Sequence, residues 1–220
     1  MAYRPTEKTL TRKAALKKQL LDAALRLVAT GGFNSLTINA AAQAAGIATG
    51  AVYQHFESKA QLSAEVFRMA TEKEVAMVQE AASGAGAPAS RLLAAIETFA
   101  LRALRSQRLA YALIAEPVDT LVDAERLRYR HAYAEIFQQL VEEGIACGDF
   151  PQQMPAVSAA ALVGVIAESL VGPLSWHMET QPGVEQTRLI RSIQAFCLRA
   201  VALKTGSLSD GVVDSHTLNG

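Results

Sequence analysis

The stretch "TINAAAQAAGIATGAVYQHFESK", residues 37–59, decides the fold of this chain. Thr37 can cap a short helix over INAAAQAA, and Gly46 can close it. A second short helix is expected over about 49–55. Two helices separated by a glycine-containing turn at this spacing have the form of a helix-turn-helix, whose second helix can enter the major groove of DNA.

Small and apolar side chains of this stretch can form a core between the two short helices. A helix of about two turns is marginal in isolation, so its neighbours must hold it. The residues expected to do so are Ile38, Ala41, Ala42, Ala45, Ile47, Val52 and Phe56.

The remaining residues of the second helix suit contact with phosphates and bases. Tyr53 and His55 offer hydrogen-bond donors on rigid rings, and Lys59 adds a charge just beyond. The amides at the helix start, near Thr49, are open to an anion. Two residues without bulk, Gly50 and Ala51, let the backbone approach base edges. The competing interpretation makes Tyr53 a half-buried core aromatic and His55 a plain surface residue.

The charge distribution favours DNA contact. The chain has 21 basic and 21 acidic residues, but residues 1–60 have eight basic and three acidic ones. That segment therefore has a net charge of +5 and the remainder −5. A basic first segment, with Arg12, Lys13 and Lys17 in its first helix, indicates an anionic partner at one end. A solvated charged helix face is the alternative.

The rest of the chain also has a helical apolar period, which predicts an all-α fold of about nine helices. Ser58 and Gln61 have capping-box spacing at the start of the fourth helix. The small, flexible segment SGAGAP separates that helix from the next. The expected helices outside the motif cover about 11–30, 58–82, 89–106, a short piece before Pro117, 121–145, 156–177 and 184–204.

This organisation predicts a DNA-binding domain over 1–60, a larger helical domain over 61–205 and a disordered tail over 206–220. The N-terminus is charged and lacks an apolar segment, which predicts a cytoplasmic protein. Residues 156–174 are nearly apolar, but Glu168 and the many small residues favour a helix buried by protein over a membrane span. Cys147 and Cys197 are expected to be reduced thiols.

Residues 33–62, "FNSLTINAAAQAAGIATGAVYQHFESKAQL", resemble the helix-turn-helix signature of the tetracycline-repressor (TetR/AcrR) family of bacterial transcriptional regulators. The resemblance implies a homodimer that binds a palindromic operator on double-stranded DNA, usually as a repressor, and releases it when a small molecule enters the C-terminal domain. It rests on Thr37, Ala41, Ala44, Gly46, Gly50, Tyr53, His55, Phe56, Lys59 and Leu62.

Carried over by position, the resemblance assigns Thr37 to a phosphate at the start of the second helix. It assigns bases to Thr49, Gly50, Ala51 and Gln54, and the DNA backbone to Tyr53, His55 and Lys59. Two positions depart from the family pattern, because Ala48 stands where a capping Ser is common and Ala51 where a hydroxyl residue is frequent.

The last two helices have apolar faces wider than one neighbour can cover, which favours a four-helix interface with a second copy; the alternative is a monomeric bundle. Small residues such as Ala160, Ala161, Gly164 and Ala167 permit a close approach. The predicted interface residues are Leu162, Val163, Ile166, Leu170, Leu189, Ile193, Phe196 and Val201.

An effector pocket is expected among the helices from about 60 to 145. Glu116, before Pro117, is either a helix-end acid or a polar anchor. The candidate lining residues are Phe99, Ala103, Tyr111, Ile114, Tyr133, Phe137, Trp176 and His177.

The competing hypothesis is a helical ligand-binding protein or an enzyme that retains the helix-turn-helix as scaffold. No nucleophile, base and orienting group lie close together in the sequence, so we expect no enzymatic activity. His131 and Glu135 share a helical face, but two ligands without a third give little support for a metal. We therefore expect neither a metal nor a cofactor.

Overall fold

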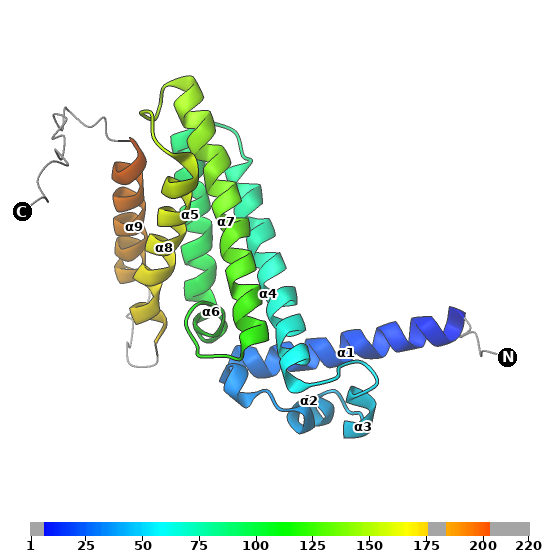
Figure 1. Ribbon diagram of the computed structural model, residues 1–220. Coiled ribbons are helices and arrows are strands. Elements are labelled where there is room, and N and C mark those ends of the chain that lie inside the picture. The colour runs from blue at the N-terminus through cyan, green and yellow to red at the C-terminus, as the bar shows by residue number, and fades with distance from the viewer. Residues whose placement is uncertain (1–6, 176–183, 203–220) are drawn as a thin grey trace, which may run out of the picture.

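The computed structural model describes residues 7–175 and 184–202. Within these residues the chain forms nine α-helices and one short 3₁₀ helix, which confirms the predicted all-α fold. Figure 1 shows α4, α5, α7, α8 and α9 as a bundle, with α1 lying across its lower end. The elements are α1 (Glu7–Gly31), η1 (Phe33–Ser35), α2 (Ile38–Ala44), α3 (Thr49–Val52), α4 (Lys59–Ala82), α5 (Pro88–Arg105), α6 (Gln107–Ile114), α7 (Thr120–Cys147), α8 (Pro155–Leu174) and α9 (Val184–Ala202).

We call residues 7–58, from α1 to the start of α4, the head, and α4–α9 the body. The head lies at the lower end of the bundle in Figure 1. Its core includes several small side chains, with Ala23 and Ala24 of α1 and Ala41 and Ala42 of α2 all buried. Alanines at a helix crossing let the backbones approach closely. Val52 and Phe56 are buried beneath them, as the sequence predicts.

Three of the predicted helix ends around the head are confirmed. The Thr37 hydroxyl accepts a hydrogen bond from the Ala40 amide at 3.0 Å, and the Ser58 hydroxyl accepts one from the Gln61 amide at 3.1 Å. Gly46 closes α2 with a φ of 65°, a left-handed conformation that suits glycine.

Helix α3 is shorter than predicted, because it ends at Val52 rather than near His55. Beyond it the backbone tightens into turns: the Gln54 amide bonds to the Ala51 carbonyl at 3.2 Å and the His55 amide to the Val52 carbonyl at 2.9 Å. These bonds reach back three residues instead of four. The contacts of Val52 and Phe56 with the core hold this segment in place.

Helix α4 belongs to both parts of the molecule. Its first turns place Leu62, Val66 and Phe67 in the core of the head, and its last turns place Val78 and Ala82 in the core of the body. The fully buried side chains of Leu62 and Val66 lie beyond residue 60. The apolar core of the head therefore continues into this connecting helix.

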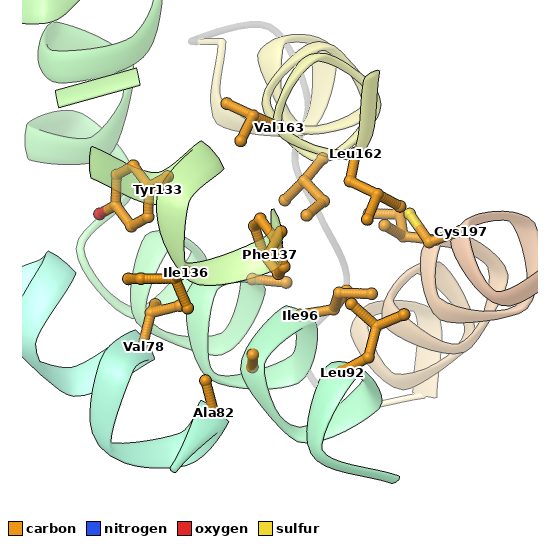
Figure 2. Close-up of a cluster of buried hydrophobic side chains, with 14 of the residues drawn as sticks. Val78, Ala82, Leu92, Ile96, Tyr133, Ile136, Phe137, Leu162, Val163 and Cys197 are labelled. Carbon is orange, nitrogen blue, oxygen red and sulfur yellow. The ribbon is translucent and has the colours of Figure 1, made fainter. Parts of the chain in front are cut away.

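The core of the body contains side chains from α4, α5, α7, α8 and α9. Figure 2 shows Phe137 of α7 in the middle of this cluster, with Ile96 of α5 and Leu162 of α8 nearby. Tyr133, one turn earlier on α7, belongs to the same core cluster (Figure 2). Leu162 and Phe137 are almost inaccessible to solvent.

Helix α8 is long and apolar enough to cross a membrane by length and composition alone. In the structure it packs against α5, α6, α7 and α9, and one side of it forms part of the core of the body. The core helix of a folded bundle has the same composition, so this finding is weak evidence for a membrane span.

Candidate nucleic-acid interface and internal cavity

The predicted DNA-contact residues around α3 lie largely at the surface. Tyr53 is 57 % exposed, which excludes the interpretation of it as a core aromatic. His55 and Ala51 are partly buried, so they are less accessible than their neighbours. The other predicted contact residues are exposed: Thr37, Thr49, Gly50, Gln54 and Lys59.

The two predicted threonine hydroxyls already make one hydrogen bond each. Thr37 accepts from the Ala40 amide, which leaves its own O–H free to donate. The Thr49 hydroxyl donates to Asn39 Oδ1 at 3.2 Å and so joins α3 to α2. Ala48 at the start of α3 has no polar side-chain group that could cap the helix. Gly50 has open space where a side chain would stand.

Positive charge from α1 reaches the surface around α3. Burial lowers the pKa of His55 below its ordinary value of 6.5, and the nearby positive charges of Lys13 and Lys17 lower it further. The Lys17 ammonium also lies 5.5 Å from the centre of the Phe56 ring. Arg12 and Lys13 are exposed. Lys13 and Lys17 therefore lie beside the helix-turn-helix, and Arg12 is exposed on the same helix.

A chain of ion pairs joins the head to the body. Lys17 of α1 contacts Glu65 of α4 at 2.8 Å, and Arg68 bridges Glu65 at 2.6 Å and Glu125 of α7 at 3.1 Å. The hydrogen bond from Lys17 lowers the pKa of the Glu65 carboxyl. These side chains are partly exposed, so each pair contributes little stability.

The body contains a cavity between α4, α5, α6, α7 and α8 that is partly open to solvent. The cavity has a volume of about 90 Å³ that is accessible to water. Most of its wall is apolar. The lining consists of Phe67, Thr71, Glu74, Val78, Phe99, Arg102, Ala103, Ser106, Leu109, Ala110, Leu113, Ile114, Arg126, Tyr129, Arg130, Tyr133, Val163 and Ala167.

Four of the eight residues predicted to line an effector pocket do line this cavity: Phe99, Ala103, Ile114 and Tyr133. Two others do not line it. Phe137 is fully buried in the core of the body, and Tyr111 packs against the core without reaching the cavity wall. Trp176 and His177 lie outside the described residues.

Sequence reasoning missed the charged part of the lining. Arg126 and Arg130 are one helical turn apart and lie on the Tyr133 face of α7, so the helical period could have revealed them. The other two charged lining residues form an ion pair, with Arg102 Nη2 2.8 Å from Glu74 Oε1. Burial is the main cause that raises the pKa of Tyr133.

Most of the predicted interface residues face inward in a single copy of the chain. Leu162, Val163, Ile166, Leu170, Ile193 and Val201 are buried within it. Leu189 is half-buried, and Phe196 is 53 % exposed. The small residues Ala160, Ala161 and Gly164 are exposed on the outer face of α8, whereas Ala167 is buried.

The described residues contain no group of three or more side chains placed to hold a metal ion. His131 and Glu135 are both exposed on α7. Cys147 is exposed and Cys197 buried, and both are free thiols. Burial raises the pKa of Cys197 to about 11.

Comparison with known proteins identifies the family. Residues 20–66 match the family described as bacterial regulatory proteins, tetR family. The repressor KstR2 of Rhodococcus jostii is 31 % identical over 143 residues, which cover 63 % of this chain and 69 % of KstR2. The chain belongs to the TetR family. The TetR-family regulator AcrR of Shigella flexneri is 36 % identical over 62 residues, 28 % of this chain and 29 % of AcrR.

Solved structures share the TetR-family fold over nearly their whole length. FadR of Bacillus halodurans aligns with a TM-score of 0.71 at 18 % identity, covering 89 % of this chain and 97 % of FadR. FadR of Bacillus subtilis, solved in complex with stearoyl-CoA, aligns with a TM-score of 0.70 at 19 % identity, covering 83 % of this chain and 98 % of FadR. This TetR-family chain is a DNA-binding transcriptional regulator, and its relatives are named as regulators or repressors.

Proposed function

We propose that this TetR-family protein is a repressor that binds a palindromic operator as a homodimer and releases it when a small, largely apolar molecule enters the internal cavity. One observation supports this more than any other. Helix α4 begins at Lys59, directly after the helix-turn-helix, and its later residues Phe67, Thr71 and Glu74 line the cavity. A continuous helix thus connects the candidate DNA surface to the candidate effector site.

In this proposal residues 1–60 form the DNA-binding domain and 61–205 the effector-binding and dimerisation domain. Thr49, Gly50, Ala51 and Gln54 contact bases. The DNA backbone is contacted by Thr37, Tyr53, His55 and Lys59. The exposure of most of these residues and the nearby charges of Lys13 and Lys17 support the assignment.

In this proposal a second copy of the chain packs against the outer face of α8 and α9. Helix α8 is strongly apolar, yet its outer face remains exposed. Its small residues Ala160, Ala161 and Gly164 permit close approach, and Phe196 of α9 offers apolar area beside them. Arg191 and Arg199 on α9 and Glu168 on α8 are exposed charges, which favour a protein partner over lipid.

The cavity lining favours an apolar molecule with an anionic group. Glu74 neutralises Arg102, and Arg126 donates to the carbonyls of Leu113 and Glu116 at 3.0 and 2.7 Å. Arg130 is exposed and makes no hydrogen bond or ion pair with any described residue, so its guanidinium is available to an anion. The stearoyl-CoA in FadR of B. subtilis combines an acyl chain with an anionic head, and it supports this class of effector.

Effector entry then acts through α4. A molecule that displaces the cavity-lining turns of α4 changes the direction of its first turns, which are packed into the core of the head. In a dimer this alters the separation of the two heads, which must match half-sites about one DNA turn, or a multiple of it, apart.

The test is selection of bound DNA from a random pool with the full chain, followed by binding at increasing salt. We expect a palindrome, and an affinity that falls steeply with ionic strength because Lys and Arg displace counterions. Gly164→Glu serves as a matched variant, since the position has open space within the protomer and the change places charge only on the proposed interface. It should leave the fold intact but weaken operator binding and dimerisation. Failure to enrich any sequence, or salt-independent affinity, would contradict the proposal.

A further inference from the structure

Glu116 is a buried carboxylate at the joint between the head and the body. It lies in the loop between α6 and α7 and is only 2 % exposed. Its Oε2 accepts from the Phe33 amide and its Oε1 from the Asn34 amide, both at 3.2 Å. These amides open the 3₁₀ helix η1, whose preceding residue Gly32 provides no side-chain cap. The body therefore supplies the missing cap of an element of the head.

Arg108 of α6 completes this cluster from the same side. Its Nη2 donates to the Gly31 carbonyl at 2.6 Å and lies 3.6 Å from Glu116 Oε1. A buried carboxylate is stable only when charge and hydrogen bonds compensate for lost water, and Arg108 with the two amides meets that requirement. Burial among such partners indicates a fixed geometry.

Gly32 makes room for the cluster. Its φ is 74°, and a Cβ there would lie 2.3 Å from Glu116 Oε2 and 2.1 Å from Arg108 Nη2. A side chain would collide with both groups in a conformation that also disfavours it. The glycine therefore allows the carboxylate and guanidinium to approach the backbone at the end of α1.

Arg126 connects this joint to the cavity. It lines the cavity, and its Nη2 donates to the Glu116 main-chain carbonyl at 2.7 Å while its Nε donates to the Leu113 carbonyl at 3.0 Å. One cavity-wall side chain thus holds both the last turn of α6 and the residue that caps η1. A molecule that moves Arg126 must also disturb Glu116.

We propose that Glu116 is a positioning residue that fixes the head on the body, and that Arg126 transmits cavity occupation to it. This rests on the proposed function only in treating the cavity as the effector site. The route runs from α7 through the α6–α7 loop to η1, and so reaches the head at the end of α1, away from the start of α4. Helix α4 and the contact of Glu116 with η1 together can set the orientation of the head. Helix α4 alone would leave the head free to rotate about the axis of that helix.

The experiment is amide hydrogen exchange by NMR on the full chain without DNA or effector. Glu116→Gln keeps the size of the side chain and removes its charge, and should speed exchange at Phe33 and Asn34 by about tenfold or more. Arg126→Gln should change the same two amides in the same direction, since it releases the loop that holds Glu116. The amide of Ala40, capped within the head by Thr37, should stay unchanged in both variants.

Arg130→Gln is the matched control, because Arg130 lines the same cavity one turn along α7 and has no contact with Glu116. If Arg126→Gln left Phe33 and Asn34 unchanged, or if Arg130→Gln changed them equally, the transmission route would be wrong. Should Glu116→Gln not fold, the Arg126 and Arg130 pair still decides the question. Because no DNA is present, this outcome is independent of whether the operator selection succeeds.

Discussion

The head and the body are built from helices of the same apolar period, but they place their functional groups on opposite sides of the helices. The head has a core in which alanines of α1 and α2 lie among larger side chains such as Phe33 and Phe56, and its polar residues face outward. The body has large core side chains and leaves a cavity among them. Protein interiors are usually close-packed with few voids larger than a water molecule, so the lined cavity distinguishes the body from the head. The head therefore offers a candidate site at its surface, and the body offers one in its interior.

The largest expected effect is on the free energy of unfolding, and it should differ between the core of the head and the core of the body. Phe56→Ala in the head should lower the free energy of unfolding by about 3–5 kcal/mol, because a buried ring is removed from a filled core. Phe99→Ala in the body should cost less, since this half-buried ring already borders the cavity. Chemical denaturation measures both.

The comparison fails if the two substitutions cost the same. Equal losses would mean that the ring of Phe99 is as well packed as that of Phe56, and that the cavity gives the body no looser interior. Phe137→Ala, a core residue of the body away from the cavity wall, should resemble Phe56→Ala and serves as the control.

The next effect concerns one exposed cation in each region. Lys59→Ala should weaken operator binding and reduce the dependence of log affinity on log salt by about one. Arg130→Ala should leave operator affinity unchanged but weaken the release caused by oleate about two- to fivefold, as expected for an exposed charged pair. Electrophoretic or fluorescence titration of the selected operator measures both quantities.

Each variant controls for the other. Release by oleyl alcohol, which has no carboxylate, should be the same for Arg130→Ala and the unaltered protein. Loss of operator affinity in Arg130→Ala, or of oleate response in Lys59→Ala, would show that the surface and the interior are not separate sites.

The smallest effect is a pH dependence located in the head. The pKa of His55 is lowered in the folded state, so the unfolded chain takes up the proton first. His55 therefore has no effect on stability well above pH 6.5 and destabilises the fold as pH falls below that value. In the body, burial raises the pKa of Tyr129 to about 12, far from neutrality.

His55→Gln should thus lose less stability between pH 7 and pH 5 than the unaltered protein, as measured by chemical denaturation. His131→Gln, an exposed histidine on the body, is the matched control. If His131→Gln altered the pH dependence of the free energy of unfolding more than His55→Gln does, the pH response would lie in the body and the prediction would be wrong.

The sequence by itself determined most of the head. Thr37, Gly46 and Ser58 determine where helices begin and end through hydrogen bonds to residues three or four positions away, and such local chemistry is readable from spacing. The family resemblance over residues 33–62 is likewise confirmed by the match to residues 20–66. The predicted end of α3 is wrong because the burial of Val52 and Phe56 in the core of the head, not helix propensity, holds that segment.

The packing of the helices in the body, by contrast, is visible only in the tertiary structure. Periodicity showed which residues of α8 are apolar, but not that Leu162 and Ile166 would turn inward while Ala160 and Gly164 stay exposed. Likewise, the sequence left Glu116 as either a helix-end acid or an anchor, because its partners Phe33 and Asn34 lie more than eighty residues away. A helical period predicts that one face of a helix is buried. Which segment covers that face depends on how distant parts of the chain pack, and this cannot be predicted from local spacing.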